Sequence, residues 1–211
     1  MKSFYFEIVF NRFVEHFAVR HSPIVDDTTT HLITDEDPEN SRKCPLTGKV
    51  LQAVARHLPI ISYRWLADCL TRKHYIDELP TYEILGDTIY SQHHGMSRSR
   101  LTHSSNSSRL LINYAFHLKC HSCQPFTDNR PLIELINLSG GIILKTLNQH
   151  INNIGRQIVI LCSKNYLQNK AALEQACRKF NILCIEPEWL IASIVKFEIQ
   201  PYEPWLCTLY S

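Results

Sequence analysis

Residues 60–70 read IISYRWLADCL, and residues 184–194 read CIEPEWLIASI. Each stretch starts with aliphatic residues typical of a short buried strand and continues into a helical pattern led by a tryptophan, Trp65 or Trp189. In both places a strand, a helix and a further strand precede the tryptophan, so the two stretches mark an internal repeat. The order of elements predicts an α/β fold with two domains, each a small, mainly parallel sheet flanked by helices.

The spacing of apolar residues predicts the same kinds of element in both halves. Pro59 ends the helix of the first half that precedes the tryptophan, because proline cannot continue a helix. The predicted helices are residues 10–17, 47–58, 63–70, 132–138, 171–180 and 187–194, and the predicted strands are residues 28–34, 60–62, 115–121, 142–144, 157–162 and 182–185.

Residues 86–109 are rich in Ser, His, Gly and Arg and almost free of large aliphatic side chains. Connections within a domain usually have about 4–6 residues, so a stretch of this length predicts a linker between domains. The predicted organisation is a first domain over 1–85, a linker over 86–112 and a second domain over 113–211. Arg98, Arg100 and Arg109 are expected to be solvated linker residues, with weak contact to DNA or chromatin as the alternative.

The composition limits the classes of function. The 211 residues are 45% hydrophobic, and the formal net charge is +2, which is too small to favour general nucleic-acid binding. No apolar run is long enough to span a bilayer, and polar residues interrupt the apolar start, so we expect neither a membrane segment nor a secretion signal. The eight cysteines lie mostly in apolar runs, which favours reduced intracellular thiols over disulfides.

One group of residues has the composition of a metal site. His117, Cys120, His121 and Cys123 combine a Cys-x-x-Cys pair with histidines, as zinc sites do. The chain lacks a second pair at useful spacing, and Cys120 and Cys123 would point to opposite faces of a strand. Structural thiols are therefore the preferred interpretation, zinc is the alternative, and no cysteine has the surroundings of a catalytic nucleophile.

Each half resembles a BRCT domain, and the pair with its linker resembles a tandem BRCT module. The resemblance covers nearly the whole chain. It is carried by residues 29–33 (TTHLI), residues 44–49 (CPLTGK) through residues 60–65 (IISYRW), residues 82–87 (YEILGD) and residues 125–127 (PFT).

The resemblance implies phosphopeptide recognition, with a phosphoserine on the first repeat and an aromatic side chain three residues later in a groove between the repeats. Lys49 would supply a cation to the phosphate and Thr47 a hydroxyl, at the start of a helix where backbone amides are free. Thr47 is equally suited to cap that helix. The residues that take the groove positions are Leu46, Leu51, Asp128, Asn129 and Ile191.

The sequence departs from the family pattern at several of these positions. The family places a third phosphate contact, a hydroxyl and a glycine amide, at the end of a first strand. In this chain the glycine position falls on Met1, so we expect that the strand either lies upstream of this sequence or has been lost, with Ser3 as a weak substitute. The arginine that clamps the ligand backbone is replaced by Leu46, and an aromatic wall residue by Leu51.

The resemblance leads to the following functional expectation. The chain is a non-enzymatic, phosphoserine-peptide-binding adaptor of a nuclear protein of the DNA-damage response and DNA repair, without cofactor, metal, membrane or small-molecule substrate. Its partners are phosphorylated proteins of that response. Two alternatives stay open: an interaction module that has lost its phosphate pocket, and a repeat that binds DNA or poly(ADP-ribose).

Overall fold

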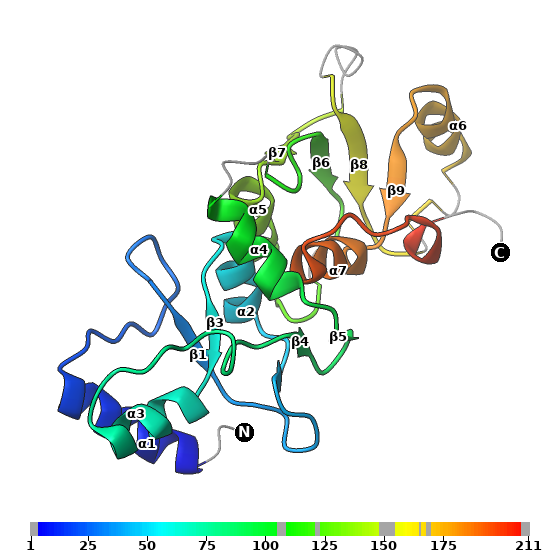
Figure 1. Ribbon diagram of the computed structural model, residues 1–211. Coiled ribbons are helices and arrows are strands. Elements are labelled where there is room, and N and C mark those ends of the chain that lie inside the picture. The colour runs from blue at the N-terminus through cyan, green and yellow to red at the C-terminus, as the bar shows by residue number, and fades with distance from the viewer. Residues whose placement is uncertain are drawn as a thin grey trace. The chain divides into compact units, whose positions relative to one another are not determined.

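Figure 1 shows a computed structural model of the chain, which describes residues 4–104, 109–120, 123–147, 155–164, 166–167 and 170–207. The chain divides into two compact units. The first consists of Met1–Asn106 with Val195–Phe197, and the second of Ser107–Ile194 with Glu198–Ser211. Among the described residues, no helix has the length and apolar character needed to cross a membrane.

The first unit carries nine regular elements among its described residues. They are α1 (Phe4–Phe17), β1 (Leu32–Thr34), β2 (Lys43–Cys44), α2 (Gly48–Ala55), β3 (Ile60–Ser62), α3 (Arg64–Arg72), β4 (Gly86–Asp87), β5 (Ser91–Gln92) and α4 (Gly95–Ser104).

The strands of the first unit form two small sheets. β1 and β3 pair in parallel, with Leu32 opposite Ile60. In the other sheet β2 and β4 are parallel, and β4 and β5 are antiparallel. Among the described residues no strand precedes α1, and β1 pairs with β3 alone. Ser3 lies outside the described residues.

The core of the first unit forms where α1 meets α3. Phe13 and Trp65 pack with ring centroids 5.5 Å apart, and the Trp65 indole N–H donates to the carbonyl of Ile76 at 2.9 Å. The partner matters because a buried indole N–H without an acceptor costs free energy. Trp65 is therefore a core residue.

Residues 86–104 contain more structure than the sequence predicts for a linker. They form β4, β5 and α4, and α4 packs on α2. Met96 and Ser99 of α4 are buried, at 1% exposure each. The Ser99 hydroxyl donates to the carbonyl of Val54 at 2.5 Å. The expectation of a solvated segment is therefore wrong for these residues, because tertiary contacts stabilise a helix whose own hydrophobic pattern is weak.

The second unit has seven helices and strands and a short 3-10 helix among its described residues. They are β6 (Tyr114–Leu118), α5 (Arg130–Leu138), β7 (Ile142–Ile143), β8 (Gln157–Leu161), α6 (Ala171–Lys179), β9 (Leu183–Ile185), α7 (Glu188–Lys196) and the 3-10 helix Glu203–Trp205.

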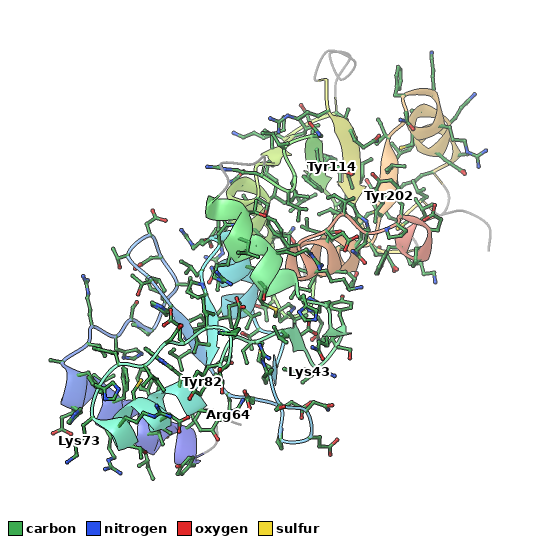
Figure 2. All side chains as sticks on the ribbon, in the orientation of Figure 1. Lys43, Arg64, Lys73, Tyr82, Tyr114 and Tyr202 are labelled. Atoms are coloured by element: carbon green, nitrogen blue, oxygen red, sulfur yellow. The ribbon has the colours of Figure 1, made fainter. Side chains whose placement is uncertain are left out.

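The sheet of the second unit has the order β7-β6-β8-β9, and every pair is parallel. Trp189 of α7 is fully buried, and its indole N–H donates to the carbonyl of Gln200 at 2.8 Å. The hydroxyl oxygens of Tyr114 and Tyr202, which are labelled in Figure 2, lie 2.8 Å apart. The predicted α/β class, with mainly parallel sheets flanked by helices, is confirmed.

Candidate phosphate-binding site

Thr47 and Lys49 lie together at the start of α2. Thr47 has extended backbone angles, φ −124° and ψ 164°, and its Oγ1 accepts the amide of Val50 at 3.3 Å. A hydroxyl that accepts one hydrogen bond still has its own proton to donate. Thr47 therefore caps the helix and keeps a donor for a ligand, and its side chain is exposed.

The start of α2 also presents backbone donors and a cation. The first amides of an α-helix have no acceptor within the helix. The Thr47 hydroxyl accepts the hydrogen bond of the Val50 amide, so the amides of Gly48 and Lys49 are the ones at this helix end that can donate to a ligand. The Lys49 side chain is exposed. A positive helix end, a hydroxyl and an ammonium group are the donors that a phosphate ester requires.

The chain segment that leads to Thr47 is held by a buried polar network. β2 ends at Cys44, three residues before Thr47, and Cys44 pairs with Asp87 of β4. Asp87 has no exposed surface and accepts the amides of Ile89 and Tyr90 at 2.7 and 2.8 Å. Burial, followed by the negative charge of Asp87, raises the pKa of the Cys44 thiol from 9.0 to about 12.

His93 completes this network. Its Nδ1 accepts the amide of Gly95 at 3.0 Å, so the ring proton lies on Nε2, which is 2.9 Å from Oδ2 of Asp87. At the edge of the same sheet, Nζ of Lys43 donates to Oγ of Ser91 at 2.9 Å (Figure 2). Neither Asp87 nor His93 was predicted from the sequence as a residue that supports the site. The available signal was the Gly86-Asp87 pair, with a histidine six residues after the aspartate.

The two leucines predicted for the peptide groove differ in exposure. Leu46 is half-buried, whereas Leu51 points into the core with no exposed surface. Leu51 therefore offers no atoms to a ligand in this structure. The role of Leu51 at the wall of a peptide groove stays a prediction, and it would require a change of structure that exposes this side chain.

The remaining groove residues belong to the second unit. Asp128 forms an exposed ion pair with Arg130 at 2.8 Å, and hydrogen bonds from Arg130 lower the pKa of the Asp128 carboxyl. Asn129 donates through its side-chain amide to the carbonyl of Cys120. Ile191 is buried in α7, with 2% exposure. The ligand contacts of these three residues stay predictions.

The residues considered for zinc have other partners. His117 is buried and donates from Nδ1 to the carbonyl of Leu144 at 2.8 Å. The Cys123 thiol lies 3.7 Å from a carboxylate oxygen of Glu188, and burial raises its pKa. His121 lies outside the described residues. Across the described part of the chain, no group of three or more potential ligands could hold a metal ion.

The three arginines of the expected linker are engaged with protein groups. Arg98 donates to the carbonyl of His93 at 2.9 Å. Arg100 pairs with the buried carboxylate of Glu83 at 2.8 Å, and the side-chain carbons of Arg109 lie over Gly140. The prediction of solvated linker bases is therefore wrong for Arg100, because its charge compensates a buried acid.

Comparison with known proteins supports the interpretation of the fold. The sequence model of the BRCA1 C Terminus (BRCT) domain matches residues 2–70. The breast cancer type 1 susceptibility protein homolog of Caenorhabditis elegans is 27% identical over 89% of the chain, and that of Rattus norvegicus is 24% identical over 94%. The chain spans 31% and 10% of the lengths of these two relatives.

Solved structures share the fold. The BRCT5–BRCT6 domains of Brc1 from S. pombe match with a TM-score of 0.60 and 20% identity, covering 90% of this chain and 87% of that one. Rtt107p, in a complex with a phosphorylated histone, matches with a TM-score of 0.54 and 14% identity, covering 92% and 82%. At these identities the likeness concerns the fold alone.

The fold consists of two α/β units, and the family match covers residues of the first one. Residues 2–70 match the BRCT domain model, the first solved structure of similar fold is a pair of BRCT domains, and the relatives by sequence are homologues of the breast cancer type 1 susceptibility protein.

Proposed function

We propose that this module is an adaptor that binds phosphoserine peptides, within a nuclear protein of the DNA-damage response and DNA repair. The observation that carries the proposal is the start of α2, where the exposed Thr47 and Lys49 side chains join two amides without an intrahelical acceptor. The complex of Rtt107p, a protein of similar fold, with a phosphorylated histone supports the same class of ligand.

The chemistry of the site matches the charge of the ligand. A phosphoserine carries about −1.5 to −2 charges and three acceptor oxygens at neutral pH. The amides of Gly48 and Lys49 and the Thr47 hydroxyl provide directed donors, and the Lys49 ammonium provides the compensating charge. An unmodified serine has neither the negative charge nor the three acceptor oxygens of the phosphate, so the site should distinguish the two forms of one peptide.

The test compares one synthetic peptide in two forms. It carries a phosphoserine with phenylalanine three residues later, and its twin has unmodified serine. We expect fluorescence anisotropy to show preferential binding of the phosphorylated form, and Lys49→Met to reduce that preference about tenfold or more, as for a charge-assisted hydrogen bond. Lys49→Arg keeps the charge and should retain most of the preference, and Lys164→Met, a surface change in the second unit, should leave it unchanged.

Thr47 needs a separate comparison because it also caps α2. Thr47→Val should remove the phosphate preference and lower stability by about 1 kcal/mol, whereas Thr47→Ser keeps both the cap and the donor. Equal affinity of the two peptides for the wild-type chain would contradict the proposal and favour the phosphorylation-independent module. Tight binding of duplex DNA with a steep salt dependence would favour the nucleic-acid alternative.

A further inference from the structure

Four of the eight cysteines lie in one place in the core of the second unit. Cys162 follows β8, Cys177 lies in α6, Cys184 in β9, and Cys207 follows the 3-10 helix Glu203–Trp205. Their exposed fractions are between 0% and 5%. Distant parts of the sequence thus contribute to one group of thiols, which the phosphate site does not use.

The thiols form two close pairs. The Sγ atoms of Cys162 and Cys207 are 3.7 Å apart, and so are those of Cys177 and Cys184. A disulfide bond is about 2.05 Å long, so each pair needs an approach of only about 1.7 Å. Small side-chain rotations within a fixed backbone can supply part of this approach.

Backbone hydrogen bonds around β9 fix the positions of the four cysteines relative to one another. The amide of Cys162 donates to the carbonyl of Ile185 at 3.0 Å, and the amide of Cys207 donates to the carbonyl of Cys184 at 2.9 Å. The segment after α6 is held as well, because the amide of Ile182 donates to the carbonyl of Cys177 at 2.8 Å. Each cysteine is therefore tied to β9 or its approach by a hydrogen bond close by.

The hydrogen bonds among the thiols make one sulfur the preferred nucleophile. The Cys184 sulfur lies 3.7 Å from that of Cys177, and hydrogen bonding with the neighbouring thiols lowers the pKa of Cys184. The same hydrogen bonding raises the pKa of Cys162 and of Cys177. Since the thiolate is the reactive form, reaction with an oxidant should begin at Cys184.

We propose that these four cysteines are an oxidative modification site, at which hydroperoxides form the disulfides Cys177–Cys184 and Cys162–Cys207. The Cys184 thiolate attacks a peroxide oxygen, so that an S–O bond forms, the O–O bond breaks and hydroxide leaves as water after taking up a proton. The Cys177 sulfur then attacks the sulfenic sulfur of Cys184, the S–O bond breaks, and the Cys177 thiol proton leaves with the hydroxide as a second water. A second peroxide converts one sulfur of the pair Cys162 and Cys207 to the sulfenic acid, and the other thiol attacks that sulfur and releases water.

The disulfides would cross-link the second unit at two points. Cys177–Cys184 joins α6 to β9, and Cys162–Cys207 joins the end of β8 to the segment after the 3-10 helix. A cross-link that the native backbone accommodates restricts the unfolded chain and stabilises the fold. The oxidised second unit should therefore unfold at a higher temperature than the reduced one.

The sequence allows a direct test on the intact chain. Trypsin places the four cysteines in separate peptides, residues 157–164, 171–178, 180–196 and 197–211. The reduced protein is treated with hydrogen peroxide, its remaining thiols are alkylated, and the digest is analysed by mass spectrometry without reduction. We expect the first peptide linked to the fourth and the second linked to the third, together with a raised unfolding temperature that a reductant reverses.

Cys69, buried in the first unit, serves as the internal control and should be recovered alkylated. Cys177→Ala should remove one link and leave Cys162–Cys207, whereas Cys69→Ala should leave both. The wild-type peptide map decides the matter even if a variant fails to fold. Free thiols at the four positions, absence of either link, other pairings, links between chains, or sulfinic and sulfonic products in their place would each overturn the proposal.

Discussion

Nε2 of His93 lies 2.9 Å from Oδ2 of Asp87, in a part of the first unit where the Asp87 carboxylate has no exposed surface. The same carboxylate accepts two backbone amides of the β4–β5 turn. Through the pairing of β4 with β2, this network supports the segment that ends at Thr47 and Lys49.

Replacing Asp87 should therefore destabilise the first unit. Asp87→Ala leaves the amides of Ile89 and Tyr90 and the imidazole of His93 without their acceptor, and we expect a loss of about 2–4 kcal/mol in the free energy of unfolding. Urea denaturation measures it. Asp87→Asn keeps one oxygen acceptor and should lose less, and Glu39→Gln, an exposed change, should have little effect. Equal stability of the Ala variant and the wild type would refute the structural role of this carboxylate.

Gly86 allows the close approach of β5. A Cβ atom at this position would lie 2.1 Å from the backbone oxygen of Ser91 and 2.7 Å from the Cα of Gln92. Gly86→Ala should therefore disrupt the β4–β5 pairing and lower the unfolding midpoint. Ser91 has φ +64°, where glycine is favoured, so Ser91→Gly should be nearly neutral. A Gly86→Ala protein that melts at the wild-type temperature would contradict this account.

The ion pair between Arg100 and Glu83 should stabilise the packing of α4 against the rest of the first unit. The Glu83 carboxylate is buried and pairs with Nε of Arg100 at 2.8 Å. Arg100→Leu leaves that charge without its cation, and we expect a loss of about 2–3 kcal/mol, partly restored by adding Glu83→Gln. The measurement is a double-mutant cycle by denaturant unfolding, with Arg20→Leu as the surface control. A cycle with no coupling energy would show that the pair does not contribute.

Cys44 should make the folding stability of the protein decline at alkaline pH. Its thiol pKa is raised from 9.0 to about 12, chiefly by burial. Between these values the unfolded chain loses the proton and the folded chain keeps it, so folding stability falls as pH rises from about 9 towards 12, by up to about 4 kcal/mol at ~1.4 kcal/mol per pH unit. Cys44→Ala should show a shallower decline over that range. Identical pH slopes for the two proteins would rule out this contribution.

Much of the fold follows from the sequence because it depends on local patterns. The spacing of Val50, Leu51 and Val54 predicts α2, and the structure buries all three. The element order of the second half likewise gives its all-parallel sheet. The helix α4 could not be predicted in this way, because Ser99 and Arg100 are polar residues whose partners, Val54 and Glu83, lie far away in the sequence.

The candidate site also has a part that the sequence predicts and a part that it does not. The positions of Thr47 and Lys49 at a helix start follow from the sequence, whereas the network of Asp87 and His93 behind them does not.

The sequence by itself determined two α/β repeats, their helices apart from α4, most of their strands, and the cation at the start of α2, because each of these depends on neighbours within a few residues. Only the tertiary structure decided that Leu51 and Ile191 are buried, that Arg100 compensates Glu83, and that four cysteines from separate elements meet in one core. These properties depend on contacts between residues distant in the sequence, and such contacts form only when the chain is folded.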